Sequence, residues 1–178
     1  MKNRMKKIII SIIMLFSGLL FGIMEGKEII QAYEVSGFYQ YETIDDNSVR
    51  IIKYTGGEIT VNIPSKLDGK NVIEIGDNAF KEGLMTYVDI PDTIVSIGFG
   101  AFYNCDSLEE ITIPDSVKEI RSSRYYETFG DCGNLKKVVI GKSVKNIGES
   151  TFRNCEQLES INIPRTVSEI GDNTFYNC

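Results

Sequence analysis

The sequence predicts a β-rich repeat solenoid, in which short parallel strands stack coil upon coil behind an N-terminal β-hairpin cap. Three recurring features support this fold class. A short apolar run ends in the same kind of dipeptide five times, at Ile63-Pro64, Ile90-Pro91, Ile113-Pro114, Ile140-Gly141 and Ile163-Pro164. A phenylalanine follows each run, at Phe80, Phe102, Phe129, Phe152 and Phe175. All four cysteines, Cys105, Cys132, Cys155 and Cys178, lie three residues after one of these phenylalanines.

The repeat interval indicates the type of solenoid. Successive cysteines are 27, 23 and 23 residues apart, and self-similarity with a period in the twenties is typical of leucine-rich-repeat coils. One such unit cannot bury its apolar face alone, so several units must stack before any of them folds. We therefore assign residues 58–178 to about five coils and expect no capping unit after the last one.

Residues 1–32 differ from the rest of the chain and indicate export. Lys2, Arg4, Lys6 and Lys7 form a basic start, the 17 residues 8–24 are predominantly apolar, and Ala32 offers a small residue for cleavage. This is the order of a secretory signal peptide. Since a membrane-spanning helix needs roughly 20 apolar residues, a cleaved signal is the first interpretation and an uncleaved N-terminal anchor is the alternative. Both place the repeats outside, secreted or at the cell surface.

Residues 33–57 are predicted to form a β-hairpin that caps the first coil. The strand-like runs FYQYETI and VRIIKY flank the polar turn DDNS, which is a hairpin pattern. Tyr41 and Tyr54 are among the aromatic residues that could cover the apolar face of the first coil. The first coil is longer than the later ones between Ile63 and Val72, and we expect its polar segment SKLDGKN to be a surface loop.

Each repeat is predicted to contain a short strand and a brief helical turn. In the run LEEITIP, buried Ile111 and Ile113 alternate with polar Thr112, which is the period of a half-buried strand. Pro114 has no N–H to donate, so it ends the strand ladder, and all four prolines of the chain occupy this position. The spacing from each phenylalanine to its cysteine fits one helical turn that directs both side chains inward.

Charge and composition exclude several classes of function. Five of the 19 Lys and Arg residues and two of the 25 Asp and Glu residues lie in residues 1–32, so residues 33–178 carry a net formal charge of −9. A nucleic-acid-binding protein normally carries a basic patch that neutralises phosphates, so no nucleic-acid partner is expected. The chain has no histidine, which excludes histidine-based catalytic triads and histidine metal sites.

The units IPDSVKEI, IPRTVSEIGDNTFYNC and IPDTIVSIGFGAFYNCDSL resemble the BspA-type leucine-rich repeat of exported and surface-attached proteins from bacteria and some protozoan parasites. The resemblance covers residues 59–178 and implies adhesion or protein recognition at the cell surface, with no catalytic residues. Three departures stand out: Arg121 replaces a glycine, Gly141 replaces a proline, and RSSRYYE is an insertion. These departures are expected to loosen the coil near residues 121–141.

The row of cysteines allows two interpretations. Stacked cysteines in neighbouring coils would have Cα separations within the disulfide range, and an oxidising exterior favours bonding. Repeat symmetry, however, points all four thiols inward side by side, where a free cysteine behaves as a small hydrophobic residue. We favour free core thiols. A linear row cannot surround an ion, so we predict no metal site and no cofactor.

Two surface regions are candidate protein-binding sites. The first is the insertion, with Arg121, Arg124, Tyr125 and Tyr126, because arginine and tyrosine dominate the binding energy of many interfaces. A solvated loop without a partner is the alternative. The second is the outward strand row of Tyr87, Glu110, Lys137 and Ser160, because solenoids often bind through an extended face.

The predicted function is therefore an exported, non-catalytic leucine-rich-repeat module for protein–protein recognition or adhesion at the cell surface. Its partner would be an extracellular or surface protein, with membrane contact only through an uncleaved N-terminal segment. A passive surface spacer or scaffold is the closest alternative, and a cell-wall hydrolase with paired carboxylates is a more distant one. The uncapped last coil predicts either a truncated product or self-association through its open end.

Overall fold

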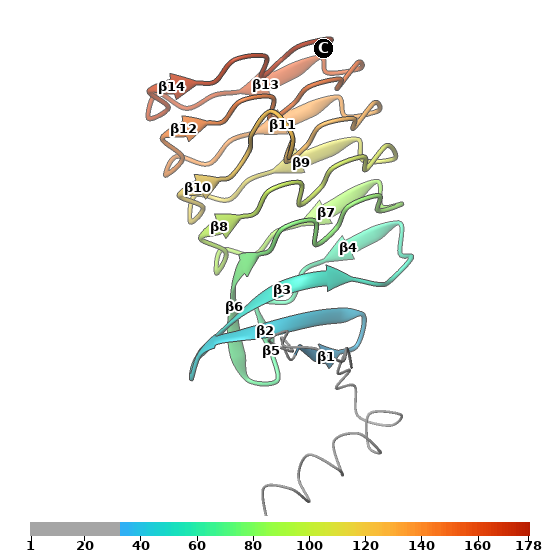
Figure 1. Ribbon diagram of the computed structural model, residues 1–178, viewed down its shortest axis with the longest axis vertical. Helices are drawn as coiled ribbons and strands as arrows, with labels where there is room; N and C mark the ends of the chain where they lie inside the picture. The colour runs from blue at the N-terminus through green and yellow to red at the C-terminus, as the bar shows by residue number, and fades with distance from the viewer. Residues whose placement is uncertain (1–32) are drawn as a thin grey trace, which may run out of the picture.

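The computed structural model describes residues 33–178, which form about five coils stacked on a folded N-terminal cap (Figure 1). The predicted signal peptide or anchor lies outside the described residues. No helix occurs in residues 33–178, so none there is long and apolar enough to cross a membrane. The predicted fold class, a leucine-rich-repeat type solenoid with short parallel strands and a hairpin cap, is confirmed.

One short strand from each coil builds a five-stranded parallel sheet. Its strands, in order of pairing, are β4 (Thr60–Asn62), β7 (Tyr87–Asp89), β9 (Glu110–Thr112), β11 (Lys137–Val139) and β13 (Ser160–Asn162). In β9 the central Ile111 is buried while Glu110 and Thr112 are exposed, as the alternation predicts. Pro114 follows closely and cannot donate to a ladder, which keeps the strand to three residues.

After the corner, each of the first three coils adds a strand to a second sheet of seven strands. This sheet contains β6 (Lys70–Ile75), β8 (Ser96–Ile97) and β10 (Glu119–Ile120), which pair in parallel, and β6 also pairs with the cap. Two more strands, β12 (Asn146–Ile147) and β14 (Glu169–Ile170), pair only with each other. The second face of the stack is therefore interrupted between the third and fourth coils.

The interruption between β10 and β12 has a local cause. Gly98 and Gly171 approach the preceding coil so closely that a Cβ there would lie 2.6 and 2.8 Å from the carbonyl carbons of Gly76 and Gly148. Arg121 occupies the equivalent position in the third coil and carries a Cβ, so the chain cannot follow the same path. Within residues 33–178, no backbone hydrogen bond joins β10 to β12.

The expected loosening near residues 121–141 is thus confined to this one face, because β9, β11 and β13 stay in register across it. Four ion pairs cross the same junction, and in each the third coil supplies the acid and the fourth the base. They are Glu109–Lys136, Glu110–Lys137, Asp115–Lys142 and Glu127–Arg153. The junction with the weakest ladder is therefore the one that carries these charge contacts.

The phenylalanines form a continuous column of rings through the core. Phe80, Phe102, Phe129 and Phe152 are buried, and neighbouring ring centroids along the column are 5.2, 5.3 and 5.3 Å apart. These separations lie within the range of favourable aromatic pairs. Tyr54 of the cap stacks on Phe80 at 5.2 Å, so the column begins in the cap. The predicted inward position of these rings is confirmed.

The predicted helical turns are hydrogen-bonded turns rather than helix. In the second coil Tyr103 donates its N–H to Gly100, but Phe102 and Asn104 donate theirs to Thr128 and Gly130 of the next coil. Every second amide therefore bonds between coils, which leaves none of the consecutive bonds that a helix needs. Asn104 has φ 55°, a left-handed conformation that asparagine tolerates well and that ends the turn.

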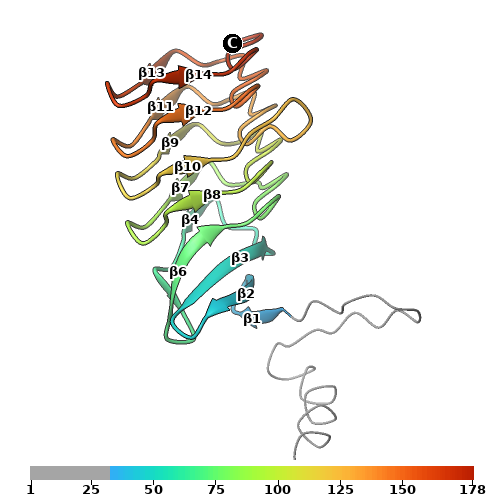
Figure 2. The same ribbon diagram turned by 60° about the vertical axis from the view of Figure 1, so that its left-hand side comes forward.

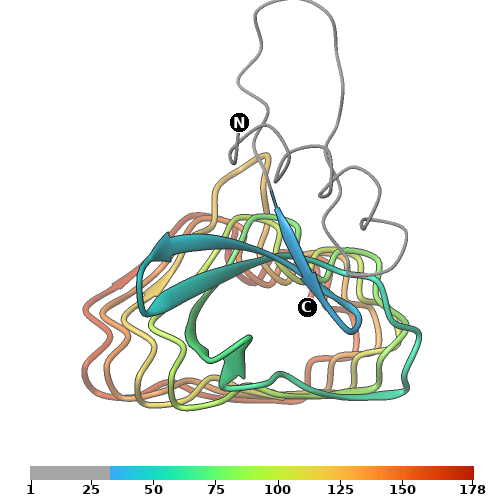
Figure 3. The ribbon, with the colours of Figure 1, turned by 90° about the horizontal axis from the view of Figure 1, so that it is seen from below.

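The cap contains the predicted hairpin and one further strand. Strands β2 (Tyr39–Asp45) and β3 (Ser48–Tyr54) pair antiparallel, and β1 (Glu34–Ser36) pairs with β2 on its outer side. Figure 3 shows these strands lying across the end of the stack. The fully buried Tyr41 anchors the cap, since its hydroxyl donates to Glu34 and to Asp68, 2.5 Å away. Burial, together with these bonds, raises the pKa of Tyr41.

The segment SKLDGKN lies at the surface, as expected, but it is a short hairpin rather than a loop. Strand β5 (Lys66–Leu67) pairs antiparallel with β6 through a tight turn at Asp68 and Gly69. Leu67 is the one residue of this segment that is buried in the core. This single apolar side chain anchors the hairpin.

The cysteines are free thiols, and Cys105, Cys132 and Cys155 are buried. Each Sγ lies near the carbonyl oxygen of the phenylalanine in the preceding coil, and the distances are 3.0 Å for Cys105, 3.2 Å for Cys132 and Cys155, and 3.0 Å for Cys178. The thiols therefore serve as weak donors between coils. Burial raises the pKa of Cys155 and of Cys178.

The last coil is less completely covered than the others. Ile163 and Ile170 are 36% and 48% exposed, whereas their counterparts Ile113 and Ile120 are buried. Phe175 still stacks on Phe152, with centroids 5.8 Å apart. Within residues 33–178 this coil packs against the fourth coil through the Phe152–Phe175 pair and through strand β13.

Substituting Phe102 by alanine should lower the free energy of unfolding by about 3–5 kcal/mol, because the ring is fully buried between two other rings. Tyr125→Ala is the matched control, since Tyr125 is 81% exposed and should change stability by less than about 0.5 kcal/mol. Urea unfolding followed by circular dichroism measures both. If both variants lose the same small amount of unfolding free energy, the stacked rings do not stabilise the core.

Thiol titration should find one readily reactive cysteine, Cys178, in the folded protein and four after denaturation without reductant. The thiolate is the reacting species, and burial shields the other three sulfurs from the reagent. Fewer than four reactive thiols in denaturant would mean that neighbouring coils are linked by a disulfide.

Candidate protein-binding surface

A groove of about 990 Å³ runs along the corner at which each coil leaves the five-stranded sheet. It extends over four coils, from β7 to β13. Its floor is apolar, formed by the buried isoleucines Ile90, Ile113 and Ile140 and by the prolines that follow the strands, Pro91, Pro114 and Pro164. The groove is also lined by the strand-end residues Asp89, Thr112, Val139 and Asn162 and by the corner residues Asp92, Asp115, Lys142 and Arg165.

The charged corner residues divide the groove into an acidic and a basic end. Asp92 and Asp115 come from the second and third coils, and Lys142 and Arg165 come from the fourth and fifth. In the middle, Asp115 accepts hydrogen bonds from the backbone N–H and from Nζ of Lys142, both at 2.9 Å. Within residues 33–178, Asp92 and Arg165 take part in no ion pair. The two ends therefore carry uncompensated charges of opposite sign.

The predicted strand row lies beside this groove. Tyr87, Glu110, Lys137 and Ser160 are paired in register on four successive strands, and all four are exposed. Tyr87 also lines the groove. Nζ of Lys137 lies 3.3 Å from a carboxylate oxygen of Glu110, an exposed pair of the kind that contributes at most about 1 kcal/mol. The charges of Glu110 and Lys137 thus neutralise each other, and the row forms a border of the groove with little net charge.

The predicted insertion site lies elsewhere on the stack. It follows β10 of the second sheet, and none of its residues lines the groove. The gold loop in Figure 2, which is also visible in Figure 3, stands out from the coils. Its tip is a tight turn, because Ser123 and Tyr126 exchange two backbone hydrogen bonds. The structure therefore does not combine the two predicted sites into one surface.

Two residues of the insertion site, Arg121 and Tyr126, hold the loop to the stack. The guanidinium of Arg121 lies over the Phe99 ring, 5.4 Å from its centroid, and 3.4 Å from Oδ1 of Asp77. The ring of Tyr126 packs against the same Phe99 with centroids 6.3 Å apart. Arg124 and Tyr125 are exposed at the tip, where the Arg124 guanidinium lies 6.0 Å from the Tyr125 centroid. Tyr126 is exposed as well, although its ring packs against Phe99.

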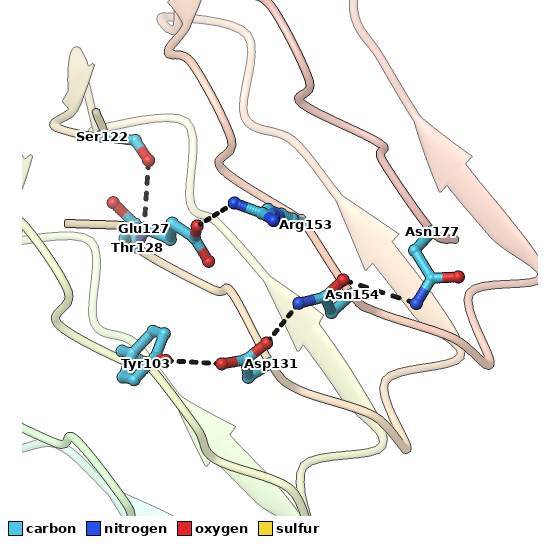
Figure 4. A network of polar contacts seen from close by, with 8 residues as sticks. All are labelled: Tyr103, Ser122, Glu127, Thr128, Asp131, Arg153, Asn154 and Asn177. Carbon is cyan, nitrogen blue, oxygen red and sulfur yellow. Dashed lines mark hydrogen bonds and ion pairs between the residues drawn. The ribbon is translucent and has the colours of Figure 1, made fainter. Parts of the chain in front are cut away.

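A polar network fixes the base of the insertion (Figure 4). The N–H of Thr128 donates to Oγ of Ser122 at 3.2 Å, and the buried carboxylate of Glu127 lies 3.4 Å from Arg153. Burial raises the pKa of Glu127 even though Arg153 opposes this shift.

In the same region the Tyr103 hydroxyl and the Asn154 amide both donate to Asp131, at 2.5 and 2.6 Å. The hydrogen bond to Asp131 raises the pKa of Tyr103 to about 12. Because these groups satisfy one another, the network positions the loop and offers no open chemical site.

The groove charges were missed by sequence reasoning. The signal was present, because Asp92, Asp115, Lys142 and Arg165 each follow directly after the Ile-Pro or Ile-Gly pair. At this position the second and third coils carry an acidic residue, and the fourth and fifth coils carry a basic one. Among residues 33–178, no group of three or more metal-binding side chains is close enough to hold an ion.

The stacked coils define the fold as a leucine-rich-repeat solenoid. Comparison with known proteins identifies the family within this class. Six copies of the BspA type leucine rich repeat match residues 73–178, so this chain belongs to that family. No curated protein matches the chain significantly in sequence.

Several solved bacterial structures share the fold. A leucine rich cell surface protein from Faecalibacterium prausnitzii is 26% identical with a TM-score of 0.59, and the match covers 87% of this chain and 54% of that protein. A leucine rich repeat protein from T. pallidum is 26% identical with a TM-score of 0.50, over 81% of this chain and 88% of the other. A leucine-rich repeat protein from Eubacterium ventriosum, 20% identical with a TM-score of 0.50 over 83% and 50% of the chains, shows the fold alone. This chain thus spans about half the length of the F. prausnitzii protein.

Removing the Lys142 ammonium should raise the pKa of Asp115. Hydrogen bonds from the backbone and side chain of Lys142 hold that pKa below its usual value. Asp115 therefore favours the folded state at pH values above its usual pKa, and this contribution is lost as the pH falls through the folded-state value. In Lys142→Ala the backbone bond remains, so a partial rise is expected in a carboxyl NMR titration. Lys145→Ala, which lies outside the groove, should leave Asp115 unchanged, and equal pKa values in both variants would contradict a side-chain contribution.

Proposed function

We propose that this protein is exported and acts as a recognition module that binds another protein at the outer surface of a bacterial cell. Three observations support the proposal. The chain belongs to the BspA type leucine rich repeat family, a relative with 26% identity is a leucine rich cell surface protein, and residues 1–32 have the composition of an export signal.

The groove along the five-stranded sheet is the observation that carries the binding role. It combines an apolar floor with charged and polar sides over four coils, which matches the apolar centre and polar rim of protein interfaces. Solenoids use such extended surfaces for recognition because neighbouring repeats hold them rigid. The net charge of −9 in residues 33–178 favours a protein partner over nucleic acid.

The insertion tip supplies a second contact. Arg124 and Tyr125 project beyond the coils and are not held by the stack, and both residue types are frequent hot spots of binding. A partner bound mainly in the groove could reach this tip only by extending around the stack. The groove is therefore the primary contact of the proposal.

Filling the groove should abolish partner binding. Thr112 is exposed at the centre of the groove, so Thr112→Arg places a long side chain across it and should weaken binding at least about tenfold, or 1.4 kcal/mol. Ser168→Arg is the matched control, since Ser168 is exposed and outside the groove lining. Binding of the purified protein to immobilised extracellular-matrix proteins and to peptidoglycan measures the effect.

Different outcomes of this assay favour different functions. Loss of saturable binding in Thr112→Arg alone supports the proposal. If the double variant Arg124→Ala and Tyr125→Ala loses binding while Thr112→Arg keeps it, the insertion is the contact site instead of the groove. Saturable binding by neither the parent protein nor the control favours a passive spacer, and release of soluble fragments from peptidoglycan favours a hydrolase.

A further inference from the structure

We infer that the groove binds an extended polypeptide segment that carries a basic side chain at one end and an acidic side chain about four residues away. This inference rests on the proposed function, because it specifies the partner for the same groove. It follows from the dimensions of the groove, from the order of its charges and from the pattern of its floor.

The dimensions fit an extended chain rather than a helix. In each coil the strand-end and corner residues that line the groove are three residues apart, as Asp89 and Asp92 are, so their Cα atoms are at most about 10 Å apart even in a straight chain. A helix with its side chains is about 10–12 Å across and would not enter. Along its length the groove crosses three strand spacings, about 14 Å, which an extended segment covers in about four residues.

The charges specify what the two ends of that segment must carry. Asp89 and Asp92 lie at the β7 end and Arg165 at the β13 end, and none of the three forms an ion pair with another residue in the described part of the chain, 33–178. Between them Asp115 and Lys142 neutralise each other. A segment with one charge sign throughout would place a like charge at one end, and such a mismatch is how surfaces reject the wrong partner. A basic group near Asp92 and an acidic group near Arg165 satisfy both ends.

The floor specifies the residues between the charged ends. Ile113, Pro114 and Ile140 form its middle, and the half-buried Val139 adds an apolar side chain to one side. In an extended segment successive side chains point to opposite faces. Every second residue therefore meets the apolar floor, while the others face solvent, so an alternating apolar and polar sequence fits.

Three capped five-residue peptides test this inference, because their two end residues are four apart and point to the same face of an extended chain. Each has alternating valine and threonine in its centre, and the ends are lysine and glutamate, two lysines, or two glutamates. Fluorescence anisotropy with the full-length protein should show the lysine–glutamate peptide binding about tenfold more tightly than either of the others.

Charge variants should then change the preference in opposite directions. Arg165→Glu makes both ends acidic and should favour the peptide with two lysines, whereas Asp92→Lys together with Asp89→Lys should favour the peptide with two glutamates. All three positions are exposed, so folding should be retained, and circular dichroism checks it. Lys118→Glu is the control, because it makes the same charge change on an exposed residue outside the groove.

The outcomes separate this inference from the proposed function. Equal affinity for the three peptides, or an unchanged preference in Arg165→Glu, overturns the charge order. If Thr112→Arg still abolishes binding of a partner protein in that case, the groove keeps its proposed role. If the folded protein binds none of the peptides, the inference of an extended ligand is wrong. The proposed function is then tested only by the assay with whole partner proteins.

Discussion

Contact between neighbouring coils is the interaction on which the rest of the structure depends. The rings from Tyr54 to Phe175 stack face to face through the core, and the thiols bond to carbonyls of the preceding coil. Amides of each turn alternate between their own coil and the next one. The ring stacking, the thiol contacts and every second amide bond are absent from an isolated coil, so the fold is a property of the stack. Every surface feature takes its position from this repeated spacing.

The features that could be predicted from the sequence are those that recur. The phenylalanines recur five times and the cysteines and Ile-Pro pairs four times, so several copies report one environment and the column of rings follows directly. Leu67 was missed because it occurs once, in a polar segment that no other coil contains. The turns were mistaken for helix because spacing alone does not show that Phe102 and Asn104 donate to the next coil.

The candidate site was harder to predict for a different reason. Arginine and tyrosine drew attention to the insertion, yet Arg121 and Tyr126 pack on Phe99 and hold the loop in place. The groove residues are unremarkable within any single repeat, where Asp92 reads as a polar residue after a proline. The order of their charges appears only when the same position is compared between coils that lie side by side in the fold. The strand row, which was compared in this way, is found in the predicted register.

The junction between the third and fourth coils has a distinctive consequence. Elsewhere the coils are joined by backbone bonds on every face, but here one face lacks its ladder and four acid–base contacts cross instead. Dissolved salt screens exposed charges strongly and leaves buried backbone bonds almost untouched. The cohesion of this junction therefore depends on ionic strength more than that of its neighbours does. A change in salinity acts most strongly at this seam, which divides the cap and the first three coils from the last two.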